Sequence, residues 1–115
     1  MTDRYDPPVT ELEEPLTVEV VSTGDEVVLV VVGELDPHTA PTLRSRVDEA
    51  VSDATTSLVL DVAGLQFIDS SGLRVIISAH KVMADKGGRL VLRAPTDNTR
   101  RLLDITGLAD HVDLA

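Results

Sequence analysis

Phe67-Ile68-Asp69-Ser70-Ser71-Gly72-Leu73 joins a predicted strand to a predicted helix. The strand is expected over residues 57–62, an apolar run typical of a buried strand. After the stretch, apolar residues recur at helical spacing until Gly87-Gly88, a pair typical of a helix end. Asp and Ser are favoured at helix starts, because their oxygens accept hydrogen bonds from the free N–H groups of the first turn. The stretch therefore predicts a strand, a short loop and a helix, with two serine hydroxyls at the positive end of the helix.

Two further strands are expected before this unit. Residues 16–21 alternate apolar and polar side chains, which predicts a half-exposed strand. Residues 27–32 are all apolar, which is typical of a strand covered on both faces. Thr23-Gly24-Asp25 is expected to turn the chain between them, and Ala63-Gly64 is expected to turn it after the strand at 57–62.

Helical spacing predicts one helix at about residues 39–53, after a loop from Gly33, with Thr39 as its N-cap and Pro41 in its first turn. A second helix is predicted over residues 70–86, with one apolar face formed by Leu73, Ile76, Ile77, His80, Met83 and Ala84. A second stripe of small apolar residues on this helix indicates either deep burial or a surface kept for a partner, and it consists of Val75, Ala79 and Val82.

Residues 89–93 are expected to form a strand, and residues 111–114 a last short one. Between them, Pro95-Thr96-Asp97 opens a third helix that ends at Gly107, with an inner face of Leu102, Leu103 and Ile105. The order β-β-α-β-α-β-α-β predicts an α/β fold, with a mixed β-sheet of four to five strands and helices packed on it. Residues 1–15 are acidic and rich in proline and are expected to be a flexible tail, so the domain spans residues 16–115.

Composition limits the kinds of function. A chain of 115 residues suits one domain. The net charge of −10 argues against binding to nucleic acid or to an anionic membrane surface. There is no cysteine, no apolar run of transmembrane length and no signal-peptide pattern, so we expect a cytoplasmic protein. We expect no cofactor.

The sequence argues against an enzyme or a metal site. The Gly-x-Ser-x-Gly pattern of serine hydrolases is absent around Ser70 and Ser71. The three histidines, His38, His80 and His111, are far apart in sequence without metal-ligand spacing, and His80 is expected in the core. An enzyme that uses Ser70 as a nucleophile remains the least favoured hypothesis.

Three stretches together resemble one family. They are Gly33-Glu34-Leu35-Asp36 followed by Thr39-Ala40, the stretch 67–73, and residues 101–108. In order and spacing they are similar to the bacterial anti-sigma factor antagonists, which are stand-alone STAS domains, and the resemblance runs from Leu16 to the last residue. It implies a single STAS-like domain that binds an anti-sigma factor with serine kinase activity and thereby frees a sigma factor. It also implies that this kinase phosphorylates Ser70 and abolishes binding, and that a PPM-type phosphatase restores it.

The resemblance also implies which residues form the site. Ser70 is the expected phosphorylation site, and the expected partner-binding residues are Asp36, Asp69, Ser71, Gly72, Leu73 and Arg74. Arg74 departs from the family, which often has a small residue there, and this affects which kinase is recognised. The alternative is an unswitched STAS scaffold, or a soluble subunit of a transporter or signalling complex, in which Ser70 is only part of a helix cap.

Overall fold

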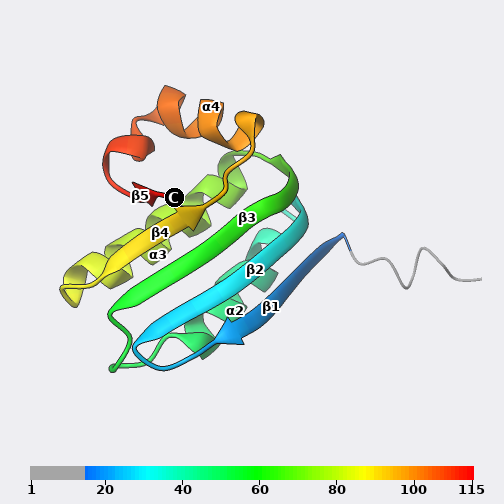
Figure 1. Cartoon of the computed structure of the whole chain (residues 1–115). Helices are drawn as coiled ribbons and strands as arrows, with labels where there is room; N and C mark the ends of the chain where they lie inside the picture. Colours follow the sequence, from blue (N-terminus) through cyan, green and yellow to red (C-terminus); the bar gives the residue numbers. More distant parts are fainter. Residues whose placement is uncertain (1–14) are drawn as a thin grey trace, which may run out of the picture.

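A computed structural model describes residues 15–115 (Figure 1). The predicted tail therefore lies outside the described residues, apart from Pro15. The elements follow one another as β1 (Leu16–Ser22), β2 (Glu26–Leu35), α2 (Ala40–Ala50), β3 (Ser57–Ile68), α3 (Ser70–Asp85), β4 (Arg89–Arg93), α4 (Asp97–Thr106), the 3₁₀ turn η1 (Leu108–Asp110) and β5 (Asp113–Leu114).

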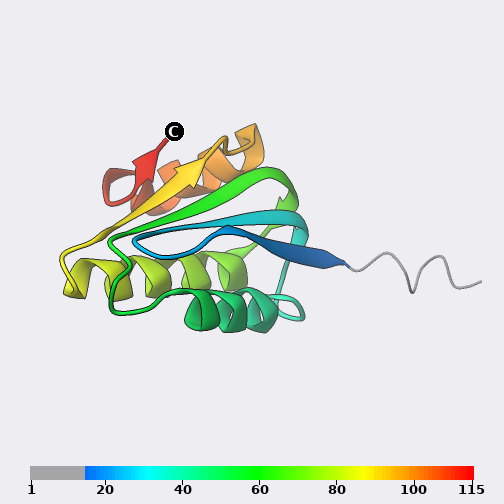
Figure 2. The same ribbon diagram turned by 60° about the horizontal axis from the view of Figure 1, so that its bottom comes forward.

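The five strands form one mixed sheet in the order β1-β2-β3-β4-β5. β1 is antiparallel to β2, and every later strand is parallel to the one before it. Figure 2 shows α2 and α3 side by side beneath one face of the sheet. The α/β class and the mixed sheet expected from the sequence are confirmed.

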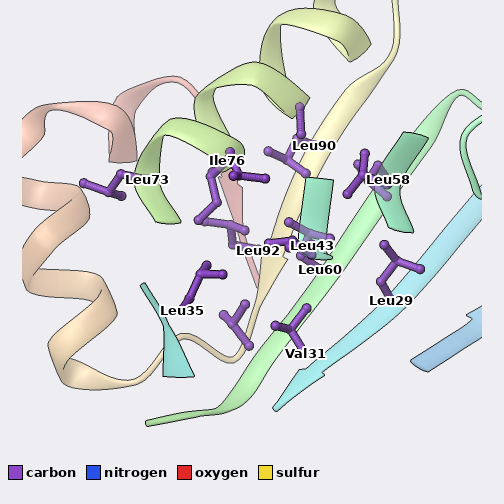
Figure 3. Close-up of a cluster of buried hydrophobic side chains, with 14 of the residues drawn as sticks. Leu29, Val31, Leu35, Leu43, Leu58, Leu60, Leu73, Ile76, Leu90 and Leu92 are labelled. Atoms are coloured by element: carbon purple, nitrogen blue, oxygen red, sulfur yellow. The ribbon is translucent and has the colours of Figure 1, made fainter. Parts of the chain in front are cut away.

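The core lies between the sheet and the layer formed by α2 and α3. Side chains alternate along a strand, so every second residue of β2, β3 and β4 points to the same face. Figure 3 shows the resulting aliphatic cluster, whose fully buried members include Leu29, Val31, Leu35, Leu43, Leu58, Leu60, Ile76, Leu90 and Leu92. Burying one such side chain stabilises the folded state by about 1.5–3 kcal/mol. This cluster therefore contributes most of the free energy that keeps α3 packed on the sheet.

The strands β2 and β3 run further than the sequence predicts. The turn expected at Ala63-Gly64 is wrong, because β3 continues through it to Ile68. Gly64 pairs with Val32, and a β-carbon on Gly64 would lie 2.9 Å from Val32 Cγ2. The glycine therefore makes room for the neighbouring strand's side chain. β2 likewise extends past Gly33, expected to begin a loop, to Leu35.

The first helix is shorter than expected. It spans Ala40–Ala50 rather than 39–53, because Thr55 closes a turn instead: its hydroxyl accepts from the Ser52 N–H at 3.0 Å and donates to the Gly24 carbonyl at 2.9 Å. Thr39 occupies the predicted N-cap position, which is confirmed, but its side chain makes no capping bond to the helix.

The helices α3 and α4 begin and end close to their predicted bounds. At the end of α3, Gly87 has φ of +76°, its N–H donates to Ala84, and the Gly88 N–H donates to Met83. Three inward positions were wrong: Ala84 is exposed, His80 is half-buried beside the His111 ring, and Ile105 is 73% exposed. In α4 the buried face is formed by Thr99 and Leu103.

Candidate functional site

The candidate site lies where β2 and β3 end together. Leu35 and Ile68 are register partners on the two parallel strands, so the next residues, Asp36 and Asp69, lie at the same carboxyl edge of the sheet. The Asp69 N–H also donates to the Leu35 carbonyl at 3.2 Å. This edge is where open α/β sheets commonly present their functional groups. The pairing of β2 with β3 therefore brings together two motifs that are more than 30 residues apart in the sequence.

Asp69 is the N-cap of α3. Its Oδ1 accepts hydrogen bonds from the N–H groups of Ser71 at 2.9 Å and Gly72 at 3.3 Å. Its backbone is extended, with φ of −124° and ψ of −167°, so the chain changes from strand to helix at this one residue. The cap fixes the direction of the first turn and therefore the direction of the side chains that follow.

Ser70 is the first residue of α3, and it is exposed. Its hydroxyl makes no hydrogen bond to any other residue of the described part, 15–115. Ser71, in contrast, is half-buried and faces the start of α2. Since the N-terminus of a helix favours negative charge, a phosphate on Ser70 would be tolerated without a change of fold.

Asp36 shapes the loop that precedes α2. Its Oδ1 accepts from the backbone N–H groups of His38 at 2.9 Å and Thr39 at 3.0 Å. These bonds, first that from the Thr39 N–H, hold the pKa of the Asp36 carboxyl below its usual value. The buried Thr39 hydroxyl accepts from the Asp36 N–H at 3.0 Å and donates to the Glu34 carbonyl at 2.7 Å. Asp36 and Thr39 thus fix each other's position beside the start of α3.

Gly72 and Leu73 lie beneath the exposed surface. Both are buried, and the Leu73 side chain is part of the aliphatic core. A β-carbon on Gly72 would lie within 3 Å of Leu35 and Ile68 side-chain atoms. These two residues therefore support the first turn of α3 from below, and their effect on a partner would be indirect.

Arg74 is exposed on the side of α3 that faces α2. It borders a hollow of about 280 Å³, whose other lining residues are Pro37, Ala40, Pro41, Arg44, Ser71 and Val75. Arg44 was not among the predicted site residues. It lies on the exposed face of α2, and its Nη2 donates to the Ser78 hydroxyl at 3.0 Å. Only the packing of α2 on α3 brings it to the site, so no local sequence pattern identifies it.

Within residues 15–115, no three His, Asp or Glu side chains are grouped so as to hold a metal ion. None of the helices described is both long and apolar enough to cross a membrane.

Comparisons with known proteins agree on one family. The STAS domain family matches residues 17–115. An anti-sigma F factor antagonist of Paenibacillus polymyxa is 42% identical over 77 residues, 66% of each chain, and an anti-sigma-B factor antagonist of Bacillus subtilis is 29% identical over 100 residues, 87% of this chain and 91% of that one.

Solved structures show the same relationship. The anti-sigma factor antagonist SpoIIAA in its unphosphorylated form matches with a TM-score of 0.72 and 27% identity over 87% of each chain. SpoIIAA of Bacillus in its phosphorylated form matches with a TM-score of 0.68 and 27% identity, over 87% of this chain and 90% of that one. An anti-sigma factor antagonist from Mycobacterium paratuberculosis matches with a TM-score of 0.77 and 29% identity, over 86% and 84%.

Proposed function

The chain belongs to the STAS domain family, and we propose that it is an anti-sigma factor antagonist switched by phosphorylation of Ser70. The observation that carries the proposal is the position of Ser70. It combines an exposed hydroxyl that makes no hydrogen bond within residues 15–115 with the first position of a helix, directly after a side-chain cap. Relatives named anti-sigma factor antagonists, and a relative solved in both unphosphorylated and phosphorylated forms, support it.

In the unmodified state the antagonist binds an anti-sigma factor and so frees the sigma factor. The surface proposed for this contact is the edge formed by Asp36, Ser70 and Arg74, held from below by Gly72 and Leu73. Asp69 and Ser71 complete the first turn of α3 at the same edge. The partner meets a neutral hydroxyl at the centre of this surface.

The partner is proposed to be a serine kinase as well as an anti-sigma factor. It transfers the γ-phosphoryl group of ATP to the Ser70 oxygen: the new O–P bond forms as the bond to ADP breaks, and the hydroxyl proton passes to a base on the kinase. A PPM-type phosphatase then hydrolyses the phosphoserine to serine and phosphate. The antagonist supplies the acceptor oxygen and no catalytic group, and in this proposal it is not an enzyme.

The phosphate acts differently in the free chain and in the complex. In the free chain its charge of about −1.5 to −2 is exposed and lies at the positive end of α3. In the complex it would be pressed against a surface that fits an uncharged hydroxyl. Such an uncompensated charge costs about 2–5 kcal/mol, which corresponds to a roughly 30- to several-thousand-fold loss of affinity.

The proposal is tested with a tagged chain used as bait in an extract of the native cells. Wild type, Ser70→Ala and Ser70→Glu are compared, with Ser71→Ala as a control on the adjacent position, and bound proteins are identified by mass spectrometry. We expect wild type, Ser70→Ala and Ser71→Ala to retain a small ATP-dependent kinase and Ser70→Glu to lose it. ATP should release wild type but not Ser70→Ala. If all four baits retain the same scaffold or transporter proteins, Ser70 is only part of the cap and the unswitched alternative holds.

A further inference from the structure

A groove between α2 and α3 is not explained by the switch itself. It has a volume of about 350 Å³ and a mainly apolar lining. The apolar residues come from both helices and are Val47 and Val51 of the α2 side and Val75, Ala79 and Val82 of α3. The last three form the stripe on α3 that the sequence marked as either deeply buried or kept for a partner. Val82 is 50% exposed, so burial by the rest of residues 15–115 accounts for the stripe only in part.

The groove is continuous with the candidate site. The hollow beside Ser71 shares two lining residues with it, Arg44 and Val75. Together the two depressions form one furrow along the contact between α2 and α3, from Ser71 to Val82. At a rise of 1.5 Å per residue, it is about 16 Å long. It therefore begins beside Ser70, the proposed phosphorylation site, and leads away from it along both helices. Figure 2 shows these two helices side by side.

The charges along the furrow are unevenly distributed. Arg44 and Arg74 are exposed at the end near Ser71, and neither forms an ion pair with another residue of 15–115. Asp48 is the acidic residue on its rim. The chain as a whole carries a net charge of −10. This local pair of arginines fits a partner that presents a carboxylate at the switch end of the furrow and aliphatic side chains beyond it.

The size of a stable interface favours the kinase as the occupant. Stable complexes bury about 800 Å² on each partner. The loop at 36–38 and the first turn of α3 present only a few exposed side chains, so a partner that holds this chain stably must also cover a neighbouring surface. The furrow is a mainly apolar surface directly adjacent to that edge, and it is continuous with it through Arg44 and Val75. A phosphatase that acts on Ser70 and leaves requires much less contact.

We infer that the furrow between α2 and α3 is a second docking contact for the anti-sigma kinase. The kinase inserts aliphatic side chains between Val51 and Val82 and places a carboxylate beside Arg44 and Arg74. This inference rests on the function proposed above. It adds that affinity for the kinase depends on residues more than two helical turns away from Ser70.

The test uses the kinase recovered with the wild-type bait, purified, and titrated calorimetrically with the antagonist in the presence of ADP. Val82→Glu places a charge in the groove, and Arg44→Glu reverses a charge on its rim; we expect each to weaken binding at least tenfold. The matched controls are Ile105→Glu and Arg101→Glu on the exposed surface of α4, which should bind within twofold of wild type. Thermal unfolding of each variant checks that it is folded.

The outcomes separate this inference from the proposed function. If both furrow variants bind within twofold of wild type while Ser70→Glu does not bind, the furrow is not a docking contact and the switch stands. If Ser70→Glu binds as tightly as wild type, the switch fails and the inference with it. If wild type forms a dimer in sedimentation experiments and Val82→Glu is a monomer, the furrow is occupied by a second copy and the inference is overturned.

Discussion

Gly72 lies directly against Leu35: a β-carbon on Gly72 would be 2.7 Å from both Cγ and Cδ2 of Leu35. Real β-carbons essentially never pack this closely, so any larger residue at this position would force Leu35 or the first turn of α3 to shift. The hydrogen bond from the Asp69 N–H to the Leu35 carbonyl joins the same two segments. The loop that carries Asp36 and the turn that carries Ser70 are therefore one packed unit.

We expect Gly72→Ala to lower the free energy of unfolding by about 1–2 kcal/mol. Overpacking against Leu35 costs about 1–3 kcal/mol, and the better helix propensity of alanine returns up to about 1 kcal/mol. Because the clash lies under the first turn, the variant should also bind the anti-sigma factor less tightly. Urea unfolding and calorimetry measure the two effects. Ser70→Ala, which lies two residues away and is exposed, is the control that should leave stability within about 0.5 kcal/mol.

Gly33→Ala should be more harmful than Gly24→Ala. Both glycines have positive φ, +118° and +103°, which alanine adopts only with strain. A β-carbon on Gly33 would in addition lie 2.2 Å from the Pro15 carbonyl oxygen, whereas none of the described atoms lies within 4 Å of one on Gly24. The clash would break the bond from the Glu34 N–H to Pro15, which is 2.7 Å long. We expect Gly33→Ala to lower the free energy of unfolding by at least about 1–3 kcal/mol more than Gly24→Ala does. Equal losses in urea unfolding would contradict this account.

Asp36→Asn should change how stability depends on pH. The pKa of Asp36 is lowered by the N–H groups of Thr39 and His38, so its ionised form favours the folded state. That contribution is fully present above the unfolded pKa, near pH 4, and is lost as the pH falls through the folded pKa. Wild type should therefore be more stable than Asp36→Asn at pH 7, and the gap should close below about pH 4. Denaturant unfolding from pH 2 to pH 7 measures this gap, with Asp53→Asn on an exposed turn as the control.

Arg74 lies one helical turn after Ser70, so it should affect the phosphorylated form. An arginine four residues away favours the doubly charged phosphate, as in other helical pairs of opposite charge. We expect Arg74→Ala to raise the second pKa of phosphoserine 70 and to leave the stability of the unmodified chain within about 0.5 kcal/mol. A phosphorus NMR titration of the two phosphorylated proteins measures the pKa. An unchanged value would show that Arg74 does not face the phosphate.

Local patterns predicted the fold class and most elements, because hydrophobic spacing and helix-end residues act within a few positions. They failed where a contact outside the recognised pattern decides the conformation or burial of a residue. Ala63-Gly64 has the composition of a turn, but Gly64 serves in β3 as the partner of Val32. Thr39 has the chemistry of an N-cap, but its hydroxyl is bonded to Glu34 and Asp36 instead. Ile105 follows the apolar pattern of α4, yet that short helix buries only Thr99 and Leu103.

The candidate site was predicted more completely on the α3 side than on the α2 side. Asp69 and Ser70 are adjacent in sequence, and their roles at a helix start follow from their own chemistry. Arg44 joins the site only because α2 packs on α3, with its guanidinium bonded to Ser78, 34 residues away. A pattern read along one segment contains no information on such a contact.

The order of the strands has a consequence for synthesis. Since each strand lies beside the one made just before it, no strand has to be inserted between two others. A nascent chain can thus build the sheet in the direction of translation, with β1 and β2 pairing first and β3 joining them. The edge that carries Asp36 and Ser70 is defined by β2, β3 and α3, which leave the ribosome before β4 and α4. We expect β4 and α4 to stabilise this edge after β2, β3 and α3 have already fixed the course of its backbone.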